Sequence, residues 1–263
     1  MTRLPLTLVV ITQDAATQLP TCLTSVPFAD EILVVDSGSR DATATLAEAH
    51  GARVVHQTWL GFGPQKRFAV EQANHDWVLC LDADESLSPA LAASIQQELA
   101  APRFHAYRFA RRNRFMGRWL RHGEGYPDWQ VRLFHRDHAQ WRTDPIHEGV
   151  ETPAPVGTLA GDLLHESAQT LENYLTKQNR YTSLQAERLI ADGKRPSPAR
   201  IVLSPLLRFL KFYLLRLGFL DGTPGLVHIL IGCFNSFSKY AKARESGQNG
   251  PSGRRSSYRA DEG

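Results

Sequence analysis

The sequence predicts an α/β fold in which a mostly parallel central sheet is covered by helices on both faces. Short apolar runs alternate with segments of helical periodicity through the first hundred residues. Several of these runs end in polar or acidic residues. Such alternation is typical of right-handed βαβ units, and sheets of this kind bind ligands beyond the carboxyl ends of their strands.

Each element of this first half follows from its local pattern. Continuous apolar runs predict strands that are buried on both faces, at 6–12, 30–38, 52–57 and 76–85. Helical spacing predicts the intervening helices, and two prolines suit first-turn positions. These helices are expected at about 17–26, 41–50, 64–74 and 88–99.

The second half is less regular. We expect strands at 104–110, 130–135 and 157–164, and a long helix at about 168–191. Residues 201–220 are strongly apolar but contain three cations, and a charge at the centre of a membrane span costs about 2.5–3.5 kcal/mol. An amphipathic helix on the membrane surface is therefore favoured, with Arg200, Arg208 and Lys211 towards anionic headgroups.

Two further features concern this C-terminal region. The apolar run 225–234 is too short to cross a bilayer. A helical pair packed against the first domain or a second subunit is the alternative to membrane contact.

The charge distribution indicates an anionic partner. Residues 1–100 hold 5 Lys and Arg against 12 Asp and Glu, whereas the remainder holds 25 against 15, which together give the net charge of +3. Ten arginines lie between Arg103 and Arg142. Nucleic acid, a phosphorylated substrate or an anionic membrane would each fit this charge, and composition does not choose among them. Arginine binds phosphate bidentately, which suits a phosphorylated partner. We find no nucleic-acid-binding motif and expect no nucleic-acid partner.

Three scattered cysteines show no disulfide or zinc spacing, which favours reduced thiols and a cytosolic setting.

Candidate ligand-binding residues follow three of the predicted strands. They are Thr12 and Asp14 after the first strand, Asp36, Ser37 and Gly38 after the second, and Asp82 and Asp84 after the fourth. Carboxylates two apart lean to one side of an extended chain, and Mg²⁺ or Mn²⁺ bridges such groups to phosphate oxygens. The alternatives are an ordinary turn capped by Asp41 and a solvated acidic turn.

The stretch "GFGPQKRFAV" places Lys66 and Arg67 in the first turn of a predicted helix. Cations there oppose the helix dipole unless an anion docks beside them. We therefore interpret Lys66, with the neighbouring Gln65, as a phosphate contact, against the alternative of two solvated charges.

The motifs "VVITQD", "VVDSGSRDAT", "GFGPQKRFAV" and "VLCLDADE" resemble, in this order, inverting family 2 glycosyltransferases of the GT-A fold. Later stretches, such as "YPDWQVRLFHR", "IHEGV" and "LLHES", resemble the bacterial lipopolysaccharide inner-core β-1,4-glucosyltransferases. The resemblance spans about residues 5–243. One departure is "ITQDAAT", where the family usually has Asn-Glu, although Asp14 keeps a carboxylate.

The resemblance implies a role for each candidate residue. Asp36 and the Thr12–Asp14 edge would hold the nucleoside, and Gln65 and Lys66 would lie near the diphosphate. Asp82 and Asp84 would contact the ribose and a divalent metal ion, Mg²⁺ or Mn²⁺. His165 would approach the metal or diphosphate, or else be structural.

Inversion requires a base at the acceptor site, and Asp128 in "GEGYPDWQVRLF" is the expected one. Glu148 and Asp144 are the other candidates, and a salt bridge to one of the many arginines is the alternative role for Asp128.

The implied reaction moves a hexose, glucose from UDP-glucose, to a lipid-linked phosphorylated saccharide, the inner-core heptose of lipopolysaccharide. It would occur in the cytoplasm, at the inner face of the bacterial inner membrane. The expected regions are a catalytic domain (1–166), a membrane-associating helical region (167–245) and a disordered tail (246–263).

Other functions are open at this point. They are transfer to another polysaccharide or lipid acceptor, nucleotidyl transfer, and a catalytically inactive membrane adaptor. The first strand lacks the glycine-rich basic loop of a nucleotidyltransferase, and the intact carboxylates speak against an adaptor.

Overall fold

The structure is a computed structural model that describes residues 3–143, 149–166 and 170–248. The chain forms two compact units, Met1–Arg121 with Gly125–Ala168, and His122–Glu124 with Gln169–Gly263. The short segment His122–Glu124 joins the second unit because the amide of His122 donates to Asp221 (2.8 Å) and Arg208 pairs with Glu124. Of the tail expected at 246–263, residues 246–248 are helical and the rest lies outside the described residues.

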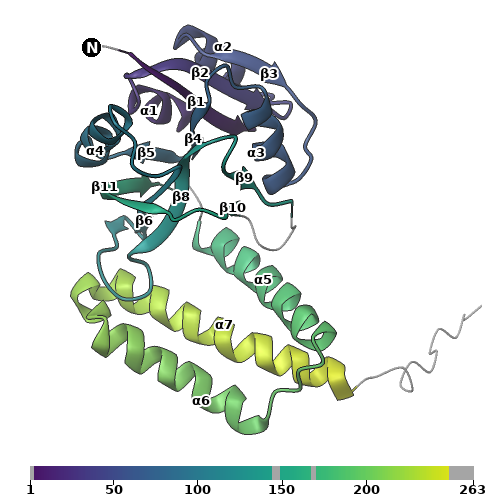
Figure 1. The fold of residues 1–263 in the computed structure, drawn as a ribbon. Helices are drawn as coiled ribbons and strands as arrows, with labels where there is room; N and C mark the ends of the chain where they lie inside the picture. The colour runs from purple at the N-terminus through teal and green to yellow at the C-terminus, as the bar shows by residue number, and fades with distance from the viewer. Residues whose placement is uncertain (1–2, 144–148, 167–169, 249–263) are drawn as a thin grey trace, which may run out of the picture. The chain divides into compact units, whose positions relative to one another are not determined.

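The first unit is built on one sheet with the strand order β3-β2-β1-β4-β8-β6-β11-β5, and β7 pairs with β6 (Figure 1). The half formed by β3, β2, β1 and β4 is parallel throughout. In the other half, β8 runs antiparallel to β4 and β6, while β11 runs parallel to β6. The strands are β1 (Leu4–Thr12), β2 (Ala29–Asp36), β3 (Arg53–His56), β4 (Trp77–Asp82), β5 (Glu85–Leu87), β6 (Ala106–Phe115), β7 (Arg118–Trp119), β8 (Asp128–His135) and β11 (Gly157–His165).

Helices cover both faces of this sheet, as predicted. Strand β1 shows why, since its successive side chains enter two different cores: Leu8 and Val10 pack with α1, α2 and α4, whereas Val9 and Ile11 pack with α3. The helices are α1 (Leu19–Thr24), α2 (Thr43–Ala49), α3 (Phe62–Glu71) and α4 (Pro89–Leu99).

The register of the parallel strands brings their carboxyl ends together. Thr12 lies opposite Asp36, and its neighbour Ile11 lies opposite Asp82. The three polar strand ends predicted from sequence therefore share one edge of the sheet.

The sequence analysis missed several short strands, of which β5 matters most. The apolar run 76–85 was predicted as one strand, but β4 ends at Asp82 and the chain turns through Ala83 and Asp84 into β5. Strand β5 pairs antiparallel with β11, which places Glu85 opposite His165. A two-stranded sheet of β9 (Gln140–Trp141) and β10 (Val150–Glu151) completes the described part of this unit.

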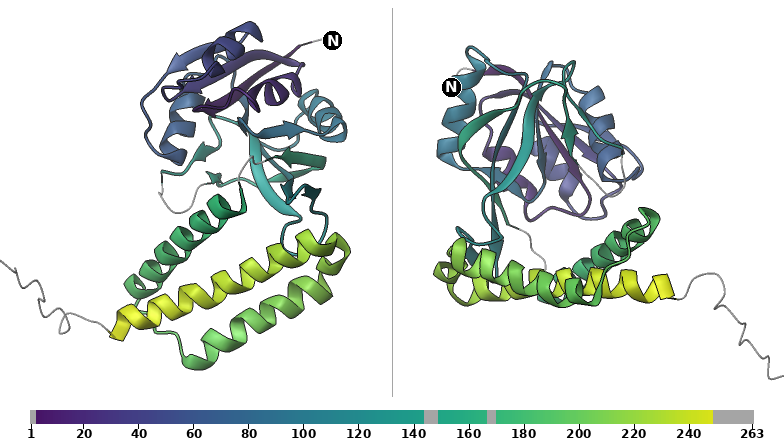
Figure 2. Two further views of the ribbon diagram at one scale, coloured as in Figure 1. Left: turned by 180° about the vertical axis from the view of Figure 1, so that it is seen from behind. Right: turned by 60° about the horizontal axis from the view of Figure 1, so that its bottom comes forward.

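The second unit consists of helices. Helix α7 packs against both α5 and α6, and Figure 2 shows the long α7 running between them. Its elements are α5 (Leu171–Ala191), α6 (Pro198–Phe209), a π-helical turn η1 (Leu210–Leu215), a 3₁₀ turn η2 (Gly218–Asp221) and α7 (Gly222–Gln248).

The apolar run 225–234 is part of the 27-residue helix α7. Among the described residues, no single helix has the length and apolar character of a membrane span. The segments Pro198–Leu215 and Gly218–Ser246, which meet at a bend of 74°, are long and apolar enough when taken together.

Candidate active site

The acidic turn after β4 is neutralised in part by cations of the chain itself. Lys66 Nζ lies 2.6 Å from one carboxylate oxygen of Asp82, and Arg132 donates to the other at 2.8 Å. Glu85 is fully buried and accepts from Arg132 (3.0 Å), Arg111 (3.2 Å) and the amide of Asp82 (3.1 Å). Lys66 is therefore paired with Asp82, and its contact with phosphate stays a prediction.

These contacts set the charge state of the turn. Burial raises the pKa of Asp82, but Arg132 and Lys66 outweigh it and hold the pKa of this carboxyl well below its usual value. Asp82 is thus an anion at neutral pH. Lys66 and Arg132 also lie over the ring of Trp141, at 4.7 and 5.3 Å from its centroid, which gives both buried cations an aromatic contact.

The third carboxylate of the turn, Asp84, faces a histidine instead of a lysine or an arginine. His165 Nε2 lies 3.2 Å from Asp84 Oδ2, and its Nδ1 lies 2.7 Å from Asn113 Oδ1. Because the amide nitrogen of Asn113 donates to Gly125 O (3.4 Å), its oxygen is the atom that accepts the Nδ1 proton. In the tautomer with the proton on Nδ1, Nε2 would offer its lone pair beside the carboxylate, an arrangement in which both atoms could bind one cation.

The geometry of this pair fits a divalent ion. Adjacent ligands of an octahedral ion at about 2.1 Å lie about 3 Å apart, close to the separation of Asp84 Oδ2 and His165 Nε2. Metal-binding histidines commonly donate their other ring proton to a carbonyl oxygen, as His165 does to Asn113. The donor set of Asp84 and His165 is therefore suited to a metal ion.

The edge formed by β1 and β2 carries the residues predicted to hold a nucleoside. Thr12 is 6% exposed, and its hydroxyl has no hydrogen-bond partner within the described residues. Asp36 is also buried and accepts from the amides of Gly38 (2.9 Å) and Ser39 (3.0 Å), so it shapes its own turn. Gly38 has φ +92°, a conformation that side chains disfavour.

Two predicted residues connect this edge to its surroundings. Gln65 is fully buried and donates to Ser37 Oγ (3.1 Å) and Gln57 O (3.2 Å), which joins α3 to the end of β2. Asp14 accepts from the amide of Arg40 (2.7 Å) and ties the loop after β1 to the loop after β2. Both residues organise the loops at the strand ends.

Asp128, the expected base, begins β8 and lies opposite Arg111 of β6. It accepts from Arg111 (2.9 Å) and from the side chain of Gln130 (2.7 Å). Burial raises the pKa of Asp128, but the charge and hydrogen bond of Arg111 lower it by more, so the pKa lies below its usual value. The salt bridge considered in the sequence analysis is present, and Arg111 connects Asp128 to Glu85. The other candidates, Asp144 and Glu148, lie outside the described residues.

A second group of metal-binding residue types lies at the opposite edge of the sheet. Asp76, His135 and Asp137 place one ligand atom each within 4.8 Å of one another. His135 pairs with Trp77 at the start of β4, about 16 Å along the strand from Asp82. This distance makes the group separate from the site around Asp84. The guanidinium of Arg136 also donates to Asp76 (3.1 Å).

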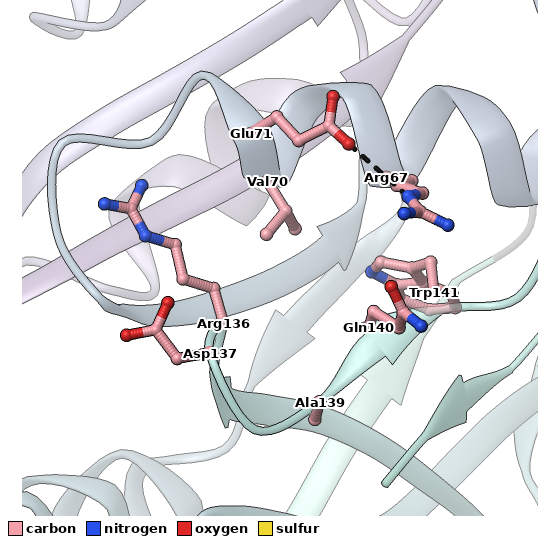
Figure 3. A pocket seen from close by; sticks show the side chains of 8 residues that line it. All are labelled: Arg67, Val70, Glu71, Arg136, Asp137, Ala139, Gln140 and Trp141. Atoms are coloured by element: carbon pink, nitrogen blue, oxygen red, sulfur yellow. Dashed lines mark hydrogen bonds and ion pairs between the residues drawn. The ribbon is translucent and has the colours of Figure 1, made fainter.

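Consecutive residues Lys66 and Arg67 face different surroundings. Helix α3 begins at Phe62, two residues before the predicted start, so neither residue lies in its first turn. Arg67 pairs with Glu71 (3.4 Å) and points into a hollow that Trp141 and Arg136 also line (Figure 3). Arg67 therefore takes no part in the contacts of Asp82 among the described residues.

The sequence analysis did not assign roles to Arg111, Asn113 and Arg132. Arg132 carried a usable signal, because an arginine between Val131 and Leu133 in a buried strand needs an anionic partner. Asn113 carried none, since its role depends on the pairing of β6 with β11, which places it opposite His165.

The sequence and structure match known glycosyltransferases. The family described as "Glycosyl transferase family 2" matches residues 7–156, more than half of the chain. The chain belongs to glycosyltransferase family 2. This family 2 chain is 30% identical over 248 residues to the lipopolysaccharide core biosynthesis glycosyltransferase LpsC of Rhizobium meliloti (strain 1021), covering 91% of this chain and 92% of the relative. It is 33% identical over 251 residues to an uncharacterized glycosyltransferase of Rickettsia bellii (strain RML369-C), covering 90% and 85%.

Among solved structures, the fold is similar to that of the mannosyltransferase PcManGT of Pyrobaculum calidifontis in complex with GDP-Man and Mn²⁺. The TM-score is 0.50 at 16% identity, covering 93% of this chain and 86% of the other. The predicted GT-A fold, family and enzyme class are confirmed.

Proposed function

We propose that this glycosyltransferase is a metal-dependent, inverting enzyme that transfers glucose from UDP-glucose to a lipid-linked phosphorylated saccharide, the inner-core heptose of lipopolysaccharide. The observation that carries the metal dependence is the pairing of Asp84 with His165, whose ring is oriented by Asn113. The similarity to LpsC supports the acceptor class. The surplus of arginines after Arg103 suits its phosphates.

In this proposal the residues divide the work by position. Thr12, Asp14 and Asp36, with Ser37 and Gly38, hold the nucleoside at the ends of β1 and β2. Thr12 suits this role because its buried hydroxyl has no partner within the described residues. Gln65 positions the loop above, and Lys66 keeps Asp82 oriented towards the ribose and contributes positive charge near the diphosphate.

A divalent ion held by Asp84 and His165, with Asp82 nearby, would supply positive charge to the leaving diphosphate. Asp128 accepts the proton of the acceptor hydroxyl while the new bond forms on the face opposite the leaving group, which inverts the anomeric carbon. Its lowered pKa keeps it ionised, and the hydroxyl becomes acidic only as the bond forms.

The test is thermal unfolding of the full chain with nucleotide sugars, in Mn²⁺, Mg²⁺ or EDTA. A ligand at 100 times its dissociation constant adds about 2.7 kcal/mol to the free energy of unfolding. We expect UDP-glucose to stabilise the protein only with metal, and Asp84→Ala and His165→Ala to remove that metal-dependent shift. The matched control, Asp137→Ala, alters the other acidic group and should keep the shift.

An equal metal-dependent shift in Asp84→Ala contradicts the metal assignment. Stabilisation by a different nucleotide sugar contradicts the donor. Transfer of label from UDP-glucose to purified inner-core acceptor, with analysis of the linkage, tests the acceptor.

We further propose that the enzyme works at the inner face of the bacterial inner membrane, because its acceptor is a lipid. The strongly apolar, cation-bearing segment 201–220 supports this placement.

A further inference from the structure

The polarity of helix α6 is reversed relative to a helix of a water-soluble bundle. Its polar side chains face the interior of the second unit: Ser204 bonds to Ser236 of α7 (2.7 Å), and Arg208 forms an ion pair with Glu124. Val202, Leu203, Leu206 and Leu207 face outwards, and each is 53–64% exposed. A helix in water buries its apolar stripe and exposes its polar one.

Exposed apolar side chains also follow the end of α6 and occur on α7. Thirteen of the 23 exposed large apolar side chains of the described residues lie between Val202 and Phe237. Exposed apolar side chains gathered in this number within one short stretch of chain indicate a site of interaction. We call this set the leucine face; it comprises Val202, Leu203, Leu206, Leu207, Leu210, Leu214, Leu215, Leu217, Phe219, Leu220, Leu230, Phe234 and Phe237.

Close approaches and polar contacts hold the interior of this unit together. Gly232 of α7 approaches the carboxylate of Glu124 so closely that a Cβ atom would overlap it. Asp221 is buried and accepts from the amide of His122 (2.8 Å). The contact between Ser204 of α6 and Ser236 of α7, with leucines outside, is of the kind that is typical of helix packing in membranes.

Charge complementarity favours an anionic lipid surface over a second protein surface. The segment 199–220 contains four cations and no acidic residue. Lys211 and Arg216 are exposed beside the leucine face, whereas Arg200, also exposed, lies over the ring of Tyr240 in α7. Arg208, which the sequence analysis directed towards headgroups, instead pairs with Glu124 inside the unit, because a half-buried guanidinium needs an anionic partner. Apolar contact is thus the larger part of the surface, and two exposed cations flank it.

The geometry points to insertion of the leucine face into the acyl region of one leaflet of an anionic phospholipid bilayer, with hydrophobic contact contributing more than headgroup charge. This inference rests on the membrane contact in the proposed function and specifies its surface and its main force. The bent pair α6 and α7 would lie in the leaflet without crossing it.

The experiment is co-sedimentation of the full chain with vesicles of phosphatidylcholine and phosphatidylglycerol, at 0.1 and 1 M NaCl. We expect Leu206→Glu/Leu207→Glu to weaken binding at least tenfold, and the rise in salt to weaken binding of the unaltered protein less than tenfold. The matched control, Leu171→Glu/Leu175→Glu, makes the same change at exposed positions of α5 and should bind as the unaltered protein does.

Insertion has its own readout. A Leu207→Trp variant should gain fluorescence that brominated acyl chains quench, beyond any quenching seen in the unaltered protein. Unchanged binding of Leu206→Glu/Leu207→Glu, complete release in 1 M NaCl, or no added quenching would each overturn the inference. The inference would also be overturned if the unaltered protein did not bind vesicles but formed a dimer, and if Leu206→Glu/Leu207→Glu made that dimer monomeric. The leucine face would then be an interface with a second copy of the chain.

Folding and the proposed reaction are checked separately. The nucleotide-sugar stabilisation, measured without vesicles, should be the same in Leu206→Glu/Leu207→Glu as in the unaltered protein. If the variant loses vesicle binding but keeps this stabilisation, the leucine face is needed for membrane binding and not for folding or nucleotide-sugar binding. Absence of the shift in every variant, with vesicle binding intact, would speak against the transferase and leave the inserted face standing.

Discussion

Replacement of Glu85 by glutamine should destabilise the first unit more than any other single neutralisation in the acidic turn. Glu85 has no exposed side-chain surface, and it accepts from Arg132 and Arg111 and from the amide of Asp82. Removing one partner of a buried ion pair costs about 3–5 kcal/mol, since the remaining charge is left without compensation. At about 2–4 °C per kcal/mol, the melting temperature should fall by about 6–20 °C.

The assay is urea and thermal unfolding followed by circular dichroism, with Glu71→Gln as the control. Glu71 is 59% exposed and forms an ion pair of 3.4 Å with Arg67, so its loss should change the free energy of unfolding by less than about 0.5 kcal/mol. A Glu85→Gln protein within 1 kcal/mol of the unaltered chain would refute the view that this carboxylate is the anchor of both arginines.

Four further outcomes follow from the structure. Asp128→Asn should lower kcat by about 10²–10⁴ with the fold intact, and an unchanged kcat would exclude it as the base. Asn113→Ala should weaken metal affinity about 10–100-fold by calorimetry, because His165 loses its orienting carbonyl; equal affinity would contradict that role. Because the folded state lowers the pKa of Asp82, this carboxylate stabilises the fold above about pH 4, and the stabilisation is lost as pH falls through the lower folded-state pKa. Unfolding midpoints measured from pH 7 to 3 should therefore fall less steeply in Asp82→Asn than in the unaltered protein, and parallel profiles would contradict this stabilising role of Asp82. Burial raises the pKa of Cys80 to about 11, so its thiol should react with a disulfide reagent only on unfolding, and rapid native labelling would disprove the burial.

The sequence predicted the parts of the fold that have a strong local signal. Apolar runs located β1, β2 and β4, and their polar ends located Thr12, Asp36 and Asp82 at one sheet edge. Strand β5 was missed because three residues, one of them a glutamate, carry no strand pattern, and its existence depends on pairing with the distant β11.

The finer parts of the site depend on such long-range pairing. Nothing local indicates that Arg132 and Lys66 converge on Asp82, or that Asn113 orients His165. The helical unit shows the same limit: the sequence identified its amphipathic character, but the direction of Arg208 is decided by Glu124, which lies 84 positions away. Local patterns predict strands and strand ends, whereas partner choice among charges requires the tertiary structure.

The turn through Ala83 and Asp84 joins two strands that occupy distant places in the sheet order. Strand β4 lies between β1 and β8, whereas β5 lies at the end of the path beyond β11. A link of two residues spans at most about 10 Å, so β8, β6 and β11 must curl until the last strand returns beside the fourth. The turn thus holds the last strand of this half of the sheet close to β4. Insertions in this turn should consequently destabilise the first unit more than insertions in loops that do not join two strands of the sheet so closely.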